Sequence, residues 1–143
     1  MKTKRITTGI VTDALGILST DSLEGNLYMF DDNRLGGSFG EGTSGLVTVL
    51  DFGDNRPDEY ELAWFVMNLR PDVSVEITDM RLQSDDVTAE RQVYDETDVT
   101  YWIIRVKNAF DTLKGTVSLR IAGRPELFTH DFTIMGKEAG DGQ

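Results

Sequence analysis

Gly36, Ser38 and Gly40 form the pattern G-x-S-x-G, which carries the nucleophile of many serine hydrolases. One histidine, His130, and several acids follow it along the chain. The hydrolase pattern requires a strand, a strained turn and then a helix. Here the next segment, residues 46–52, is an apolar run typical of another strand, and further glycines surround Ser38. The pattern therefore favours a hairpin loop, and we expect the protein not to be an enzyme.

Acidic clusters in predicted loops suggest a second chemistry, because calcium takes six to eight oxygen ligands from carboxylates and carbonyls. The clusters occupy residues 31–33, 51–59, 84–87 and 95–98. The EF-hand template fails at the first of them, since Leu35 and Gly42 stand at two ligand positions. The candidate binding residues among these clusters are Asp31, Asp32, Asn33, Asp51 and Asp54. We expect each cluster to be a solvated acidic turn and the protein to need no cofactor, with calcium as the alternative, and the sequence assigns no metal ligands.

Aromatic residues suggest a third chemistry, because flat rings suit sugar rings and carboxylates can hold hydroxyl groups. Such a carbohydrate platform could draw on Trp64, Trp102, Tyr94 and Tyr101, and Trp64 is the candidate binding residue among them. Trp102 falls in phase with Ile104 and is expected to point inward. His130 falls in phase with Phe128, on the apolar face of the last predicted strand, and is expected to be a packed histidine rather than a ligand.

Alternation of apolar and polar residues is the dominant pattern and predicts strands with one buried face. The predicted strands lie at residues 5–11, 26–30, 46–52, 60–67, 73–78, 102–107, 116–121 and 127–134. Gly, Asn, Asp and Pro clusters separate them. Residues 12–22 are predicted to form at most a turn or two of helix. The fold class expected is an all-β, antiparallel β-sandwich, jelly-roll or immunoglobulin-like, of about eight or nine strands.

The chain has 143 residues, which fits one domain over 1–143, and we expect flexible ends at 1–4 and 137–143. No segment has the length of a signal peptide's apolar region or of a membrane span. Fourteen basic and twenty-five acidic residues give a net charge of -11, which disfavours nucleic acid and anionic membranes as partners. We expect a cytoplasmic or virion-associated protein.

Several short stretches resemble the PixA/AidA family of bacterial inclusion-body proteins. They are Asp13 with "ILS" at 17–19, "YMFDD" at 28–32, "GEGTSGL" at 40–46, Gly53-Asp54 with Trp64, "SVEI" at 74–77 and "LFTHDFTI" at 127–134. The family's last strand typically contains Trp-Asp-Pro, whereas this chain keeps Asp131 and Ile134 without the Trp and Pro. The resemblance implies a β-sandwich that self-associates or accumulates in the cell, and it brings no catalytic residues.

These observations predict a non-enzymatic structural protein that acts by self-association or by decorating a larger assembly. The expected partner is a second copy of the chain or another protein of such an assembly. A binding module for calcium or a carbohydrate is the alternative function, because the acidic loops and the aromatic residues would suit either ligand.

Overall fold

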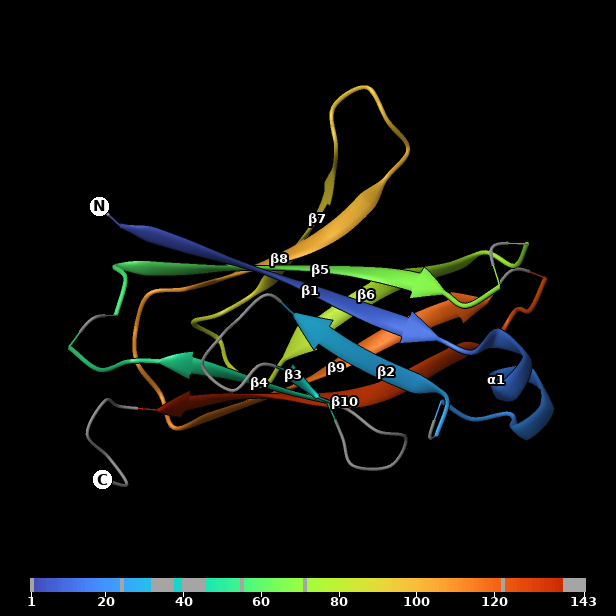
Figure 1. Ribbon diagram of the computed structural model, residues 1–143, viewed down its shortest axis with the longest axis horizontal. Helices are drawn as coiled ribbons and strands as arrows, with labels where there is room; N and C mark the ends of the chain where they lie inside the picture. The colour runs from blue at the N-terminus through green and yellow to red at the C-terminus, as the bar shows by residue number, and fades with distance from the viewer. Residues whose placement is uncertain are drawn as a thin grey trace.

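Two five-stranded sheets pack face to face in the computed structural model (Figure 1). It describes residues 2–23, 25–31, 38–39, 46–54, 56–70, 72–121 and 123–137. Sheet A has the order β2 (Leu27–Asp31), β1 (Thr3–Thr12), β5 (Glu59–Asn68), β8 (Thr100–Val106), β7 (Ala89–Val93). Sheet B has the order β3 (Ser38–Phe39), β4 (Leu46–Asp51), β10 (Leu127–Lys137), β9 (Thr112–Ile121), β6 (Val75–Leu82). The predicted all-β sandwich is confirmed.

Both sheets are mixed rather than purely antiparallel. The β1–β5 pair and the β4–β10 pair are parallel, while the remaining pairs are antiparallel. Parallel neighbours need a long connection between them. Between β1 and β5 the chain forms α1 and β2 and then β3 and β4 of sheet B. Strand β5 therefore pairs with β1 in the same direction. Alternation within a strand cannot reveal this direction.

The core is built by the inward-facing residues of both sheets. On β9 every second side chain is buried, namely Leu113, Gly115, Val117, Leu119 and Ile121. Trp64 of sheet A meets Phe132 of sheet B, with ring centroids 5.1 Å apart. Burial of each such large apolar side chain stabilises the fold by about 1.5–3 kcal/mol. The two sheets are therefore held together mainly by apolar contact between their inner faces.

One short helix, α1 (Ala14–Thr20), connects β1 to β2. The Asp13 carboxylate accepts a hydrogen bond from the backbone N–H of Gly16, which caps the first turn. Asp21 ends the helix in the left-handed conformation, at φ 58°. This is the turn or two of helix predicted for residues 12–22. No helix in the described part of the chain is long and apolar enough to cross a membrane.

The ends of the first and last strands and one edge strand also differ from the sequence-based expectations. Thr3 and Lys4 lie in β1 and Lys137 lies in β10, although these residues were expected in flexible ends. Strand β7 was not predicted, because its sequence AERQV has no clear alternation. It forms a hairpin with β8 that projects from the sandwich (Figure 1). At its tip, Tyr94 stacks on Tyr101 with centroids 4.4 Å apart.

Candidate functional site

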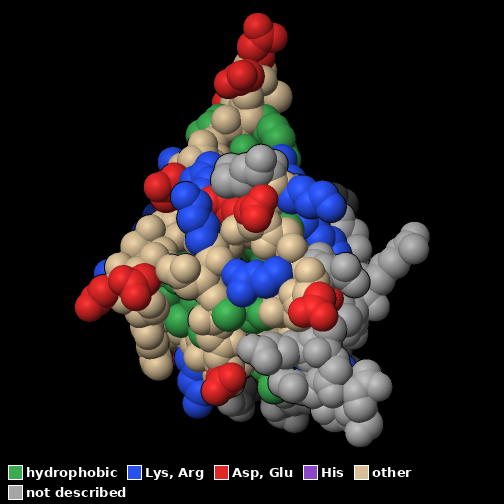
Figure 2. All heavy atoms as spheres, turned by 90° about the vertical axis from the view of Figure 1, so that its left-hand side faces the viewer, with side chains coloured by type: hydrophobic (Ala, Val, Ile, Leu, Met, Phe, Trp, Pro, Cys, Tyr) green, Lys and Arg blue, Asp and Glu red, His purple; other side chains and the backbone are tan. Residues whose placement is uncertain are grey.

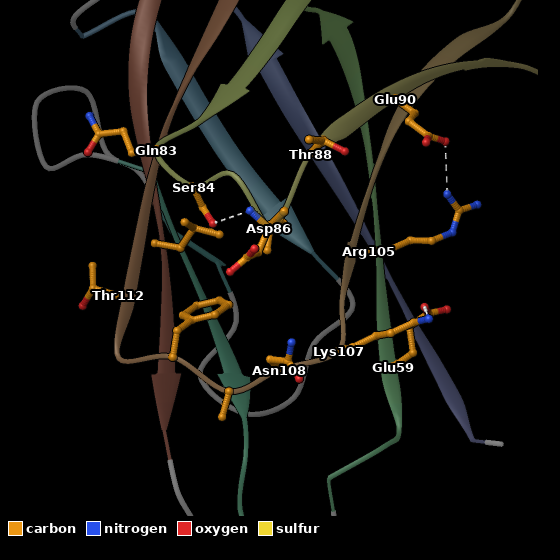
Figure 3. A pocket seen from close by; sticks show the side chains of 14 residues that line it. Glu59, Gln83, Ser84, Asp86, Thr88, Glu90, Arg105, Lys107, Asn108 and Thr112 are labelled. Carbon is orange, nitrogen blue, oxygen red and sulfur yellow. Dashed lines mark hydrogen bonds and ion pairs between the residues drawn. The ribbon is translucent and has the colours of Figure 1, made fainter.

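A cavity of about 560 Å³ lies where the chain crosses twice between the sheets. One wall is the connection from β6 to β7 at residues 83–88, and the other is the connection from β8 to β9 at residues 107–111. Charged side chains come from the start of β5 (Glu59), the end of β8 (Arg105), the residue after it (Lys107), β7 (Glu90) and the β6–β7 connection (Asp86), as Figure 3 shows. Its volume falls within the usual range for small-molecule sites.

The charged side of the cavity combines both signs. Glu59 has a side chain only 9% exposed, and its Oε2 lies 3.8 Å from Nζ of Lys107. That separation exceeds hydrogen-bond length, so the ammonium offsets the buried charge without donating to it directly. Arg105 lies 3.2 Å from Glu90 and 3.6 Å from Glu61. Glu59 is therefore a buried acceptor at the edge of a solvent-accessible cavity.

The remaining walls are polar with one aromatic surface. The hydroxyl of Ser84 accepts a hydrogen bond from the backbone N–H of Asp86, at 3.1 Å, which shapes the β6–β7 connection. Phe110 packs edge-on against Phe52, with centroids 5.2 Å apart. Other lining side chains with amide or hydroxyl groups are Gln83, Thr88, Asn108 and Thr112. Such a cavity can hydrogen-bond a small polar molecule and pack against its apolar edge.

The candidate binding residues from the acidic clusters that the structure describes do not line this cavity, although Glu59 and Asp86, from the clusters at 51–59 and 84–87, do. Asp51 ends β4, where its carboxylate accepts a hydrogen bond from the N–H of Gly53 at 2.7 Å. Asp54 lies in the following turn, and Asp31 ends β2. Asp32 and Asn33 lie outside the described residues. Within the described ranges, no three acidic or histidine side chains are grouped to hold a metal ion.

Trp64 corrects the predicted carbohydrate platform. Its side chain is fully buried on β5 against Phe132, so its ring faces the core rather than a ligand. Trp102 is buried as its phase predicted, and its indole N–H donates to the Ile77 carbonyl at 3.3 Å. The aromatic residue that lines the cavity is Phe110.

Ser38 and His130 belong to different strands of sheet B. Ser38 is paired with Thr48 in the β3–β4 ladder, and β4 is the next described element along the chain. His130 lies on β10, where its Nδ1 is 2.7 Å from the Asp131 carbonyl oxygen. The helix that the G-x-S-x-G pattern requires does not follow Ser38 within the described residues.

The outer faces of the two sheets differ in polarity. Sheet A exposes large apolar side chains, including Tyr28 at 44%, Phe30 at 47% and Met67 at 48%. The outer face of sheet B exposes Leu127 and Met135 of β10 but otherwise presents mainly polar side chains from β9 and β10, namely Lys114, Thr116, Ser118, Arg120, Thr129, Asp131 and Thr133. Exposed apolar patches on a soluble domain are typical of interaction surfaces.

Charge is also distributed unevenly over the surface. Viewed from one end, basic and acidic side chains are interspersed on the body of the sandwich, and acidic ones stand at the tip of the β7–β8 hairpin (Figure 2). The Arg56 guanidinium donates to the Lys107 carbonyl at 2.6 Å. The net charge of -11 therefore does not describe every face of the molecule.

Neither the cavity nor the apolar face was predicted, although the face left a signal in the sequence. The runs "NLYMF" and "YELAWFVM" are apolar at consecutive positions, whereas a strand with one solvated face should alternate. The cavity left no such signal, because its walls come from separate connections that only the topology brings together.

Fold and surface together define a β-sandwich protein with two mixed sheets, one short helix and an apolar patch on the outer face of sheet A. A family model described as Domain of unknown function (DUF8788) matches residues 4–126, and the chain belongs to this family. No curated protein matches the chain.

A solved structure extends the comparison to the whole fold. The crystal structure of an inclusion body protein (PixA) from Burkholderia cenocepacia J2315 is similar over 96% of this chain and 97% of that chain. The TM-score is 0.67 and the sequence identity 13%. The predicted resemblance to inclusion-body proteins is thereby confirmed for the fold.

Proposed function

We propose that this chain is a non-enzymatic protein that self-associates, as an inclusion-body protein does. The observation that carries the proposal is the exposure of Tyr28, Phe30 and Met67 on one sheet face. Covering such a surface stabilises association by about 25 cal/mol per Å² of apolar area before the costs of binding. The likeness to an inclusion body protein over nearly the whole of both chains supports the same function.

The expected partner is a second copy of the chain, or a protein of a larger assembly that it decorates. The net charge of -11 makes nucleic acid and anionic membranes poor partners. A cytoplasmic or virion-associated location is consistent with this role. No cofactor is required for association through apolar side chains.

Solution mass tests the proposal directly. Light scattering is measured over a wide concentration range, first in chelator and then in excess calcium. We expect a discrete oligomer in chelator, whose population grows with concentration. The mass of a single chain at every concentration would contradict self-association. An oligomer that forms only with calcium would instead assign the function to the acidic loops.

A second candidate function, binding of a small carbohydrate, is favoured by the buried Glu59 in the cavity. Cationic Lys107 beside Glu59 repels a cationic ligand, and Asp86 with Glu90 repels an anionic one. A hydroxyl group meets neither penalty, because it donates to a carboxylate and accepts from an ammonium. Phe110 supplies an apolar wall for the ring of a sugar.

Calorimetric titration with a panel of neutral glycans tests this second candidate. We expect measurable heat of binding. Glu59→Gln is expected to lower the affinity at least about tenfold, because the buried charged acceptor becomes a neutral amide. Glu76→Gln is the matched control, because Glu76 is also ion-paired, at 3.9 Å to Arg120, but is exposed on sheet B. Flat titrations over the whole panel would end the carbohydrate hypothesis.

A further inference from the structure

The apolar residues on the outer face of sheet A form two neighbouring rungs across three strands. In one rung Val11 lies between Tyr28 of β2 and Met67 of β5, and in the next Gly9 lies between Phe30 and Phe65. Since side chains alternate along a strand, all these residues point to the same side of the sheet. We call this surface the apolar face: Val11, Tyr28, Phe30, Phe65 and Met67.

Gly9 makes the apolar face a packed surface rather than a set of independent side chains. The rings of Phe30 and Phe65 meet edge to face over it, with centroids 6.2 Å apart. A Cβ at position 9 would lie 2.6 Å from the Phe30 ring and 2.9 Å from the Phe65 ring. The two rings hold each other in place, so little side-chain freedom remains to be lost when a partner covers them.

The rest of this outer face is electrically balanced. The charged side chains that alternate onto it from β1, β5, β7 and β8, together with Lys107 directly after β8, are three cations and three carboxylates: Arg5, Arg105, Lys107, Glu59, Glu61 and Glu90. Glu61 lies 3.8 Å from Arg5 and 3.6 Å from Arg105, so the signs alternate across the sheet. In a chain with a net charge of -11, this face does not repel its own copy.

We infer that two copies of this chain bind each other face to face through the outer surfaces of their A sheets. This inference rests on the proposed self-association and assigns its surface. A two-fold axis brings the same patch of each copy together, so a self-complementary face is required. The outer face of sheet A is self-complementary, because its apolar rungs can cover one another and its charged residues alternate in sign. The mainly polar outer face of sheet B offers no such surface.

Two methionines provide a matched test of the surface. Met67 lies in the apolar face and is 48% exposed, while Met135 lies on the outer face of sheet B and is 44% exposed. Met67→Lys and Met135→Lys add the same charge at similar exposure. Sedimentation equilibrium gives the dissociation constant of each variant. We expect Met67→Lys to weaken association at least about tenfold and Met135→Lys to leave it within about twofold.

The outcomes separate this inference from the proposed function. An oligomer that Met67→Lys leaves intact, or that Met135→Lys weakens more, would overturn the assigned surface while self-association stood. Wild-type protein that stays monomeric would overturn both. Circular dichroism establishes that each variant is folded. If Met67→Lys does not fold, Tyr28→Ser at the edge of the same face makes the equivalent test, with the same tenfold loss expected.

Discussion

At the scale of single residues, the Tyr60 side chain hydrogen-bonds the start of β5 to the end of β4. Its hydroxyl donates to the Asp51 carbonyl oxygen at 2.6 Å and accepts from the Asp51 N–H at 3.1 Å. Burial raises the pKa of Tyr60 above its ordinary value of 10.0, because the phenolate loses hydration. The phenol is therefore the form that the fold accommodates.

Substitution of Tyr60 tests this account. Tyr60→Phe is expected to lower the free energy of unfolding by about 1 kcal/mol at neutral pH, since both hydrogen bonds are lost. A pKa raised in the folded state gives stability that is present below pH 10.0 and is lost as the pH rises through the folded value. Urea unfolding should show that alkaline loss in wild type and less of it in Tyr60→Phe. The exposed-site control Tyr28→Phe keeps Tyr60 and should show the full wild-type loss. An alkaline loss in Tyr60→Phe as large as that in wild type would contradict the assignment to Tyr60.

Trp64 and Phe65 show what the sequence could not decide at this scale. Both lie in an apolar run, and the register of β5 sends Trp64 into the core and Phe65 to the outer face. A one-residue change of register would exchange them. A sequence predicts an aromatic residue on a strand well, but its face is fixed by pairing with β1 and β8, which are distant along the chain.

At the scale of elements, the regularity of a strand decides how well it is predicted. Strand β9 alternates cleanly and was predicted, whereas the β7 edge strand AERQV carries charge and little burial. Edge strands contribute few buried side chains, so their alternation is weak. The cavity could not be predicted for a different reason: its walls are connections between strands, and their positions depend on the order of strands in the sheets.

Gly136 lies on β10 and contacts the β8–β9 connection, which forms one wall of the cavity. Its N–H donates to the Asp111 carbonyl at 2.8 Å, and a Cβ added there would collide with the Phe110 carbonyl oxygen and the Phe52 ring. Gly136→Ala is expected to lower the free energy of unfolding by about 1–3 kcal/mol, because the β8–β9 connection must move. Thermal unfolding measures the loss. The control is Thr133→Ala, which is on β10 like Gly136 but points outward. Gly123→Ala cannot serve as the control, because its φ of 84° would add backbone strain. Unchanged stability in Gly136→Ala would show that the connection yields freely.

At the scale of the whole molecule, charge and apolar surface act in opposite directions. A net charge of -11 repels copies of the chain, whereas the association that we propose would cover the apolar face, where the local charge is balanced. This division would let an acidic sandwich associate by one face without general aggregation. The composition predicted the repulsion, and the sheet order was needed to locate the attraction.

Methionine oxidation in the wild-type protein tests the central claim most directly. Met67 and Met135 are similarly exposed in the single chain, so peroxide should oxidise them at comparable rates in dilute solution. The rates are measured by peptide mass spectrometry at concentrations below and above the rise in solution mass. Association through the apolar face predicts that the Met67 rate falls on concentration while the Met135 rate does not. A rise in mass without selective protection of Met67, or no rise at all, would contradict the account.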